Sequence, residues 1–306
     1  MKIFISGATG LIGATLSADL AAAGHDVYRL VRKRADAVGG NVYWNPAAGE
    51  LDASALAGAD AIVNLAGESI AAGRWNEARK RAIHDSRTAA TRTIAAVLAQ
   101  PNGHPQVLIN ASATGYYGDR GDEWLDETSA AGSGDFLSGV CRDWEAAAEP
   151  ARRAGARVVF TRFGVVLSGA GGALRQMLLP FRLGVGGVIG SGRQYLSWVS
   201  LDDVVDAIIE CLSNDSLSGP VNVVAPNPVT NREFTKTLGR VLRRPTILPM
   251  PAFAARLALG QMADELLLAS QRVRPAKLLA AGYDFKFPTL EAALTRALYP
   301  WAHGAG

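Results

Sequence analysis

The chain has 306 residues, of which 49% are hydrophobic and 19% charged, so it is long and apolar enough to bury a large core. Its formal net charge of +3, with no long run of like charges, argues against a nucleic-acid-binding surface. The two cysteines lie far apart and the four histidines lack metal-ligand spacing, so we predict neither disulfides nor a metal site. The chain begins with a strand-like run rather than a signal peptide, and it has no apolar stretch of the roughly 18 residues that a membrane span needs. We therefore expect a cytoplasmic protein without a membrane partner.

In the first half of the chain, short apolar runs alternate with helical patterns, as is typical of parallel βαβ units. Six such runs separated by helices predict a Rossmann-type, doubly wound parallel sheet. The predicted strands are residues 3–5, 26–31, 41–44, 59–65, 106–111 and 157–161, and the predicted helices are residues 11–23, 75–100 and 134–154.

The regular alternation ends after the sixth predicted strand. Residues 169–192 are rich in glycine, which suits a flexible loop over a ligand cleft. A core-like helix is predicted over 202–212, and the chain from Pro220 onward is punctuated by prolines and mainly helical. We therefore predict a smaller, mainly helical lobe beside the sheet. The expected division is residues 1–165 with 195–215 for the nucleotide-binding domain, and 166–194 with 216–306 for the lobe.

A glycine triplet, Gly7, Gly10 and Gly13, directly follows the first predicted strand and opens the first predicted helix. In this position the first glycine makes a tight turn, the second lets the backbone approach a diphosphate, and the third lets the helix pack against the strand. The amides and dipole of the helix N-terminus then favour the anion. The alternative is a glycine-rich turn that binds no ligand. The position of the glycines between a predicted strand and a predicted helix favours the dinucleotide site. The predicted dinucleotide contacts of the loop are Gly7, Thr9, Gly10, Leu11, Ile12 and Gly13.

The end of the second predicted strand indicates which dinucleotide is bound. An NAD site usually places Asp or Glu about 20 residues after the glycines, to bind the ribose hydroxyls. This chain has Arg32, Lys33 and Arg34 there, and no carboxylate before Asp36. A guanidinium binds a 2′-phosphate through paired hydrogen bonds. We therefore predict NADP(H) rather than NAD, with Arg32 as the first and Lys33 as the second phosphate ligand; the alternative is a solvated basic loop.

Further motifs follow the other predicted strands: Asn64-Leu65-Ala66-Gly67, then Ser112-Ala113-Thr114-Gly115-Tyr116-Tyr117-Gly118, then Arg162-Phe163-Gly164-Val165-Val166. Together with the glycine loop, they resemble the extended short-chain dehydrogenases of the NAD-dependent epimerase/dehydratase superfamily. Other segments resemble the atypical, YfcH-like "epimerase family" branch, some members of which are labelled SulA-like cell-division inhibitors. These segments are Glu68, 74–75, 85–87, 116–118, 144–145, 192–194, 225–231 and 272–283.

The resemblance covers nearly the whole chain and implies NADP(H) binding more firmly than any reaction. It also implies a homodimer formed through the helices near 75–100 and 134–154. For Glu68 and Arg74 the alternative to cofactor contact is a surface ion pair. Arg87 would either reach a phosphate or lie on a solvated helix face. The cofactor contacts that the resemblance adds are Leu65, Ala66, Gly67, Glu68, Arg74, Arg87, Ala111 and Val165.

Active members of the superfamily use a Ser or Thr after the fifth strand and a Tyr-x-x-x-Lys on the next helix, whose Lys lowers the pKa of the Tyr. This sequence has no Tyr-x-x-x-Lys. Alignment through Glu145 places Leu137 and Cys141 at the Tyr and Lys positions, so the usual mechanism is absent.

Three residues are candidate substitutes. Ser112 lies at or beside the Ser/Thr position, with the register open by one residue. Tyr116 or Tyr117 could donate a proton, and the alternative for both is aromatic packing with a satisfied hydroxyl.

A substrate would meet residues beyond the glycine-rich segment. Arg193 and Gln194 resemble an element that contacts the substrate phosphate in sugar-nucleotide enzymes, and Trp198 could stack on a base or sugar or pack in the core. The preferred hypothesis is an NADP(H)-dependent oxidoreductase acting on a small polar carbonyl or sugar-type compound. The rival is a non-catalytic NADP(H)-binding redox sensor or regulator, perhaps in cell division. A competent nucleotide-sugar epimerase ranks last, because its chemistry depends most on the missing pair.

Overall fold

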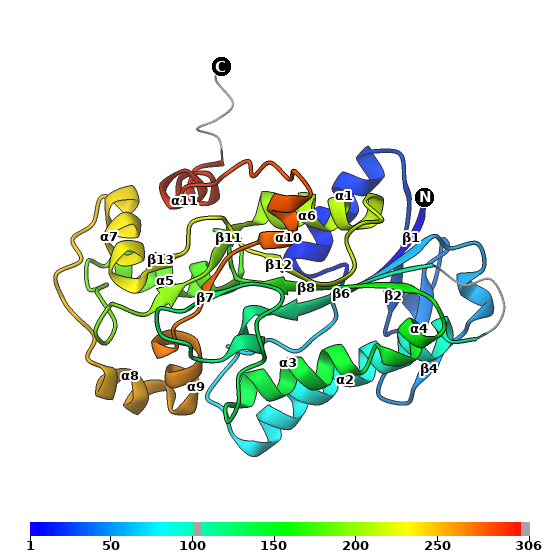
Figure 1. The fold of residues 1–306 in the computed structure, drawn as a ribbon, viewed down its shortest axis with the longest axis horizontal. Helices are drawn as coiled ribbons and strands as arrows, with labels where there is room; N and C mark the ends of the chain where they lie inside the picture. The colour runs from blue at the N-terminus through cyan, green and yellow to red at the C-terminus, as the bar shows by residue number, and fades with distance from the viewer. Residues whose placement is uncertain (101–105, 301–306) are drawn as a thin grey trace.

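An eight-stranded sheet forms the centre of the computed structural model, which describes residues 1–100 and 106–300 (Figure 1). Its strand order is β12-β8-β6-β5-β1-β2-β3-β4. All neighbours pair in parallel except β3 and β4, which are antiparallel. The strands are β1 (Lys2–Ser6), β2 (Asp26–Val31), β3 (Val42–Asn45), β4 (Glu50–Leu51), β5 (Ala61–Asn64), β6 (Val107–Ala113), β8 (Arg157–Phe163) and β12 (Gly219–Val223).

Helices cover both faces of this sheet, because successive side chains of a strand point to opposite sides. In β1, Ile3 and Ile5 lie in the core beneath α1 and α6, whereas Phe4 lies in the core beneath α2 and α4. Figure 1 shows these two helical layers above and below the strands. The helices are α1 (Leu11–Ala22), α2 (Glu77–Leu98), α3 (Phe136–Ala146), α4 (Glu149–Arg153) and α6 (Leu201–Ser213). The predicted doubly wound fold is confirmed.

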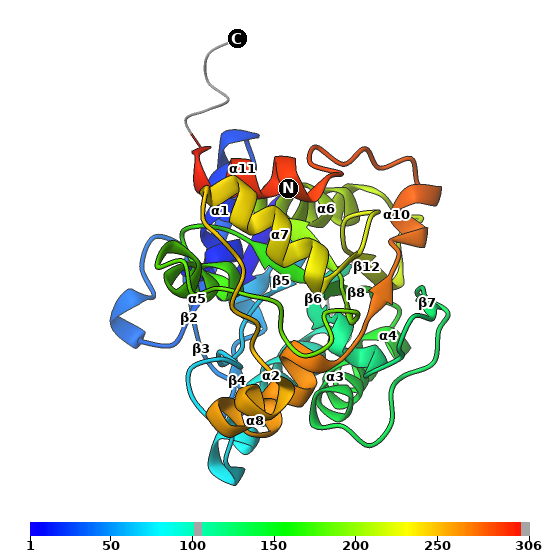
Figure 2. The same cartoon turned by 90° about the vertical axis from the view of Figure 1, so that its left-hand side faces the viewer.

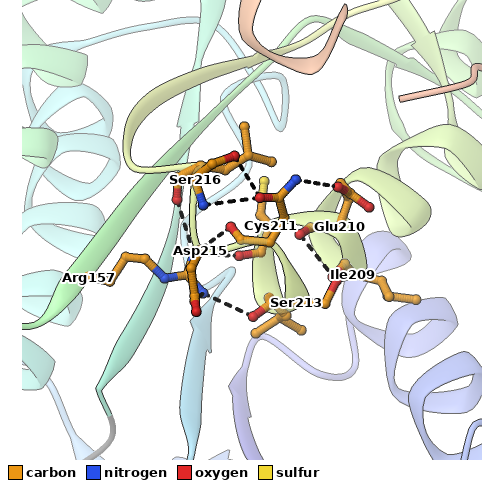
Figure 3. Close-up of polar contacts among 10 residues, drawn as sticks. Arg157, Ile209, Glu210, Cys211, Ser213, Asp215 and Ser216 are labelled. Atoms are coloured by element: carbon orange, nitrogen blue, oxygen red, sulfur yellow. Dashed lines mark hydrogen bonds and ion pairs between the residues drawn. The ribbon is translucent and has the colours of Figure 1, made fainter. Parts of the chain in front are cut away.

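Arg157, the first residue of β8, fixes the end of α6 to the sheet. Its guanidinium donates to the carbonyls of Cys211 and Leu212, at 2.8 and 3.0 Å, and to that of Leu217 at 3.0 Å (Figure 3). It also forms an ion pair with Asp215 at 3.3 Å. Because the last carbonyls of a helix have no partner within the helix, one arginine here satisfies groups that would otherwise be left unpaired.

A smaller lobe has its own apolar core, in which Leu174, Trp198, Phe234 and Leu294 are buried. It is mainly helical, as predicted, with three small two-stranded sheets, one of which pairs its β14 with β7 from the loop after β6. Its elements are β9 (Val165–Leu167), α5 (Gly172–Arg182), β10 (Tyr195–Leu196), β11 (Trp198–Ser200), β13 (Val229–Thr230), α7 (Asn231–Leu242), α8 (Ala252–Leu259), α9 (Gln261–Ala263), the π-helical η4 (Asp264–Leu268), β14 (Arg272–Val273), α10 (Ala276–Ala280) and α11 (Leu290–Leu298). The remaining short elements are β7 (Trp124–Leu125) and the 3₁₀ turns η1 (Arg34–Asp36), η2 (Ser54–Leu56) and η3 (Thr114–Tyr117).

Two predictions about the second half were wrong. The segment 169–192, expected to be a loop, contains helix α5, whose apolar face packs into the core of the lobe. The predicted division left residues 216–306 outside the sheet, whereas β12 pairs with β8 as an edge strand of it. The chain therefore returns to the sheet after building part of the lobe. Among the described residues, no helix is long and apolar enough to span a lipid bilayer.

Candidate functional site

The glycine loop follows β1, where the strand order of the sheet reverses. The chain continues to β2 on one side of β1 and later returns to β5 on the other side. Gly7 has φ +69°, and a Cβ there would lie 2.7 Å from the carbonyl oxygen of Leu65. A Cβ on Gly13 would lie 2.3 Å from the carbonyl oxygen of Gly7. Gly10 is the N-cap of α1, and in the described chain no side chain caps its free amides. The loop therefore offers a narrow cradle of backbone amides at the carboxyl edge of the sheet, which suits a diphosphate.

The basic segment after β2 lies beside this cradle, because the parallel register pairs Ser6 at the end of β1 with Leu30 in β2. Arg32 and Lys33 are exposed. Arg34 differs from them, since its guanidinium stacks on the ring of Tyr43 at 4.1 Å. Arg32 and Lys33 are thus the two cations of this segment that a 2′-phosphate can reach without breaking a stacking contact.

The loop after β5 forms the other wall of the cradle. The amide of Ala66 donates to Ser6 Oγ at 3.2 Å, and that of Glu68 donates to Ser86 Oγ at 3.0 Å. Leu65 is the residue that crowds Gly7. These bonds fix the backbone of the loop next to the glycines. Leu65 and Ala66 therefore lie beside the glycine loop, and the cofactor contact of Leu65, Ala66 and Gly67 stays a prediction.

Three charged residues predicted to contact the cofactor differ in their surroundings. The Glu68 carboxylate lies 3.5 Å from Arg79, which matches the surface ion pair considered from the sequence. Arg74 is exposed and points toward Gly260, at the junction of α8 and α9. The Arg87 guanidinium lies under Gly67, stacks on Trp144 at 5.1 Å and donates to the carbonyl of Ile83. Burial lowers the pKa of Arg87, and the contact with Gly67 places this cation beside the loop after β5.

A buried polar network, which sequence reasoning missed, holds the strand ends beneath the cradle. Ser6 donates to Asn64 at 2.6 Å, and Asn64 donates to Asn110 at 2.7 Å and to Thr91 at 3.0 Å. The Trp144 indole donates to Thr91 at 3.0 Å. Because each group has a partner, the network fixes β1, β5 and β6 relative to α2 and α3. Two other predicted contacts border this region: Ala111 is buried in β6, and Val165, half-buried, begins β9.

The structure brings Leu137 and Cys141 to the end of β6, as the alignment placed them. A Cβ on Gly115 would lie 3.4 Å from Leu137 Cβ and 3.8 Å from Cys141 Sγ. Both side chains are buried, and burial raises the pKa of the Cys141 thiol to about 12. Neither residue can act as the phenol or the ammonium of the usual mechanism.

The helix that carries these residues is capped by Asp135, which accepts from the Ser138 amide, and by a second carboxylate from the other lobe. Glu265 of η4 accepts hydrogen bonds from the backbone amides of Phe136 and Leu137, at 3.1 and 2.8 Å. A carboxylate at a helix N-terminus is favoured by the dipole and satisfies amides that have no partner within the helix. No local sequence pattern indicated this contact, since its partners lie 128 or 129 positions apart.

Ser112 is hydrogen-bonded to a buried ion pair between Glu145 and Arg162. Its hydroxyl donates to Glu145 at 2.7 Å, and Arg162 binds the same carboxylate with two hydrogen bonds of 2.8 Å. Ser112 is 2% exposed. Its only proton is therefore directed at Glu145 rather than at a ligand.

The two tyrosines have different surroundings. Tyr117 is 0% exposed, accepts a hydrogen bond from Arg162 at 3.0 Å and donates to Asn222 at 2.7 Å. Burial raises the pKa of Tyr117 to about 12, so the predicted proton-donor role does not fit this residue. Tyr116 is half-buried, with the Arg162 guanidinium 3.5 Å from its ring centre. Tyr116, Glu145 and Arg162 line a cavity of about 450 Å³ beside α3 and α4.

Two of the three predicted substrate contacts are structural. Trp198 is 0% exposed in the core of the smaller lobe and donates to the carbonyl of Asn227 at 3.0 Å, so it cannot stack on a ligand. The Gln194 amide donates to the carbonyls of Ile189 and Leu267, both at 3.0 Å, and ties the loop to η4. Arg193 is exposed and stays a candidate anion contact.

Residues 3–224, which include the cradle and the strand ends around it, match the model of the "NAD dependent epimerase/dehydratase family". The chain belongs to this family. Residues 250–297 match a second model, described as a domain of unknown function (DUF1731). "Epimerase family protein MT2273" of Mycobacterium tuberculosis is 49% identical over 292 residues, which cover 95% of this chain and 96% of that relative. The resemblance to the "epimerase family" branch is thereby confirmed.

Two solved structures are similar to nearly the whole of this chain. The human epimerase family protein SDR39U1 (isoform 2), crystallised with NADPH, is 37% identical, with a TM-score of 0.87 over 97% of this chain and 99% of that one. The nucleoside-diphosphate sugar epimerase of Corynebacterium glutamicum is 39% identical, with a TM-score of 0.81. That match covers 97% of this chain but 58% of the Corynebacterium chain.

Proposed function

We propose that this epimerase family protein binds NADP(H) in the glycine cradle and that the bound cofactor serves as a regulatory signal. The fit rests on the tight turn, in which a Cβ at Gly7 or Gly13 would collide with neighbouring backbone, and on the uncapped amides of α1. Arg32 and Lys33 would hold the 2′-phosphate. The human relative that was crystallised with NADPH supports the same choice.

The observation that carries the regulatory role is the chemistry at the end of β6. When bound, NADP(H) supplies or accepts a hydride, and the protein must move a proton to or from the reacting oxygen. The positions that would do so hold Leu137 and Cys141, and the hydroxyl of Ser112 is bound to Glu145. The residues of the site therefore support cofactor binding, but they do not supply the proton transfer that turnover of a substrate needs.

Cofactor preference is tested by isothermal titration with NADPH and with NADH. We expect NADPH to bind at least about tenfold more tightly, since each 1.4 kcal/mol of phosphate contact is tenfold in affinity. Arg32→Ala should remove most of that preference. The matched control is Arg34→Ala, because Arg34 stacks on Tyr43 and should leave the preference nearly unchanged. Equal affinities for the two cofactors in the unaltered protein would contradict the assignment.

A second candidate function is an NADP(H)-dependent oxidoreductase that acts on a small polar carbonyl or sugar-type compound. It is favoured by Tyr116, a half-buried phenol beside a guanidinium. NADPH consumption is measured across a panel of aldehydes, ketones and keto-sugars. The regulatory proposal expects none above the rate without protein. Turnover that Tyr116→Phe abolishes, while NADPH affinity stays the same, would establish the oxidoreductase instead.

We also propose the homodimer that the family resemblance implies, through α2 and α3, and a cytoplasmic location. Sedimentation equilibrium tests the first: we expect the mass of two chains at micromolar concentration. A monomer at these concentrations would contradict it.

A further inference from the structure

Large apolar side chains are unusually exposed on two segments of the smaller lobe. Of the twelve large hydrophobic residues that are exposed in the described chain, eight belong to these segments. Their exposed fractions reach 77% for Leu257 and 76% for Ile247. The eight are Leu179, Leu183, Val185, Ile247, Leu248, Met250, Phe253 and Leu257.

The two segments lie side by side. The amide of Met250 donates to the carbonyl of Val188 at 2.8 Å, and that of Gly190 donates to the carbonyl of Met250 at 2.9 Å. Arg244 donates to the carbonyl of Arg182 at 3.0 Å. Figure 2 shows α5, α8 and the chain between α7 and α8 on the side that faces the viewer. We call residues 179–185 and 243–257 the α5–α8 face.

The exposed apolar side chains of each helix lie on one side of that helix. Leu179 and Leu183 are four residues apart at the end of α5, and so are Phe253 and Leu257 on α8, so each pair lies on one side of its helix. The buried side of α5, which includes Leu178, already packs in the core of the lobe. Folding therefore does not account for the outward leucines. Large exposed apolar patches generally mark interaction surfaces.

The charge of the α5–α8 face indicates the charge that its partner carries. The α5–α8 face holds four arginines and no aspartate or glutamate. One of these, Arg256, is paired with Asp264 at 2.8 Å. The ion pairs found among the described residues involve none of the other three: Arg182, Arg243 and Arg244. The partner is therefore apolar and anionic. A second copy of this face is disfavoured, because it would bring like charges together.

We propose that the α5–α8 face docks on an anionic phospholipid bilayer, with its aliphatic and aromatic side chains at the acyl boundary and its arginines among the headgroups. Projecting side chains suit insertion into a lipid interface, and none of the eight lines the cavity beside α3. Arginines near an anionic leaflet add attraction that salt screens. The sequence predicted no membrane partner because it contains no span, but peripheral docking needs none.

The test is co-sedimentation of the full chain with vesicles of phosphatidylcholine alone and of phosphatidylcholine with about 30% phosphatidylglycerol, where the lipid sets a surface potential of tens of millivolts. We expect binding to the anionic vesicles that weakens in high salt, and little binding to the neutral ones. Phe253→Ser with Leu257→Ser should weaken binding roughly tenfold or more, since each side chain loses apolar contact. Leu183→Ser tests α5 separately.

Leu279→Ser is the matched control, since Leu279 is 49% exposed on α10, outside the face. It should bind vesicles like the unaltered protein. All the changed residues are exposed, so NADPH affinity and the circular dichroism spectrum should stay the same and show that the variants are folded. Equal sedimentation with both kinds of vesicle, or unchanged binding by the α8 double variant, overturns the proposal. So does self-association that this variant abolishes, because the face would then join two copies of the chain.

Discussion

Gly13 is the residue at which the cradle tolerates least change. Its missing side chain lets α1 approach the turn, because a Cβ would meet the carbonyl oxygen of Gly7 at 2.3 Å. That oxygen is backbone and can move only with the whole loop. We expect Gly13→Ala to destabilise the protein by roughly 1–3 kcal/mol and to abolish NADPH binding. Urea unfolding and titration calorimetry measure the two effects.

Gly139 is the matched control for this substitution. It lies inside α3, and a Cβ there would lie 3.8 Å from its nearest neighbour, the flexible Arg142 side chain. Gly139→Ala should therefore stabilise the protein by about 0.5–1 kcal/mol, because alanine loses less entropy in a helix. Wild-type NADPH affinity in Gly13→Ala would show that the cradle is not the cofactor site.

The buried ion pair between Glu145 and Arg162 is a second feature that depends on single residues. Its members are 11% and 3% exposed, so a guanidinium left without its carboxylate would remain buried. We expect Glu145→Ala to cost about 3–5 kcal/mol in the free energy of unfolding. Glu149→Ala, which breaks exposed pairs with Arg152 and Arg153, should cost less than about 1 kcal/mol. Similar losses in the two variants would mean that the buried pair is not what holds the ends of β6 and β8.

At the scale of elements, His84 links α2 to α3. Its ring nitrogens lie 2.9 Å from Asp85 and 3.0 Å from Asp143. The hydrogen bond to Asp85, followed by the contacts with Asp143, raises the pKa of His84 above its usual 6.5. A raised pKa in the folded state means that His84 contributes stability below pH 6.5 and loses it as the pH rises through the folded-state value.

We therefore expect the stability gap between the unaltered protein and His84→Gln to be largest near pH 6 and to shrink toward pH 8, since the charged imidazole makes the contact. Urea unfolding at several pH values measures this gap. His25→Gln, a histidine change away from these helices, is the control. A gap that widens with pH would show that the neutral ring makes the link.

The elements that could be predicted from the sequence are those whose signal is local. The central strands β1, β5, β6 and β8 are buried on both faces and form continuous apolar runs, which the sequence analysis placed to within a few residues. Helix α5 was missed because glycines flank it on both sides and Pro180 lies inside it. β12 was missed because Pro220 suggested a break, whereas an edge strand tolerates a proline.

The features of the candidate site also divide into those with a local sequence signal and those without one. The glycine cradle and the absence of the Tyr-x-x-x-Lys follow from short motifs. The Ser112–Glu145 hydrogen bond and the Glu265 cap join residues 33 or more positions apart, and only the fold brings them together. Trp198 shows the limit most clearly, since a tryptophan that stacks on a ligand and one that fills a core have the same sequence pattern.

At the scale of the whole molecule, the two lobes depend on each other. Leu290, Ala293 and Leu294 of α11 share a core with Leu174 and Trp198, and Glu265 caps a helix of the sheet domain. We expect a chain ending at residue 249 to lose cooperative unfolding, because it removes three of the eleven buried residues of that core and uncovers their neighbours. Near-UV circular dichroism during urea unfolding measures this. A shortened chain with the midpoint of the full protein would show that the lobes fold independently.

The late position of β12 and Glu265 also has a consequence during synthesis. A ribosome adds about 5–20 residues each second, so β8 leaves it several seconds before the strand that covers its edge. Until residue 219 emerges, the nascent chain carries an unpaired strand edge, which is a template for association with other chains. The amides of Phe136 and Leu137 at the start of α3 wait longer still for the Glu265 carboxylate. Ribosome-associated chaperones would therefore matter most for this protein between the translation of β8 and that of η4.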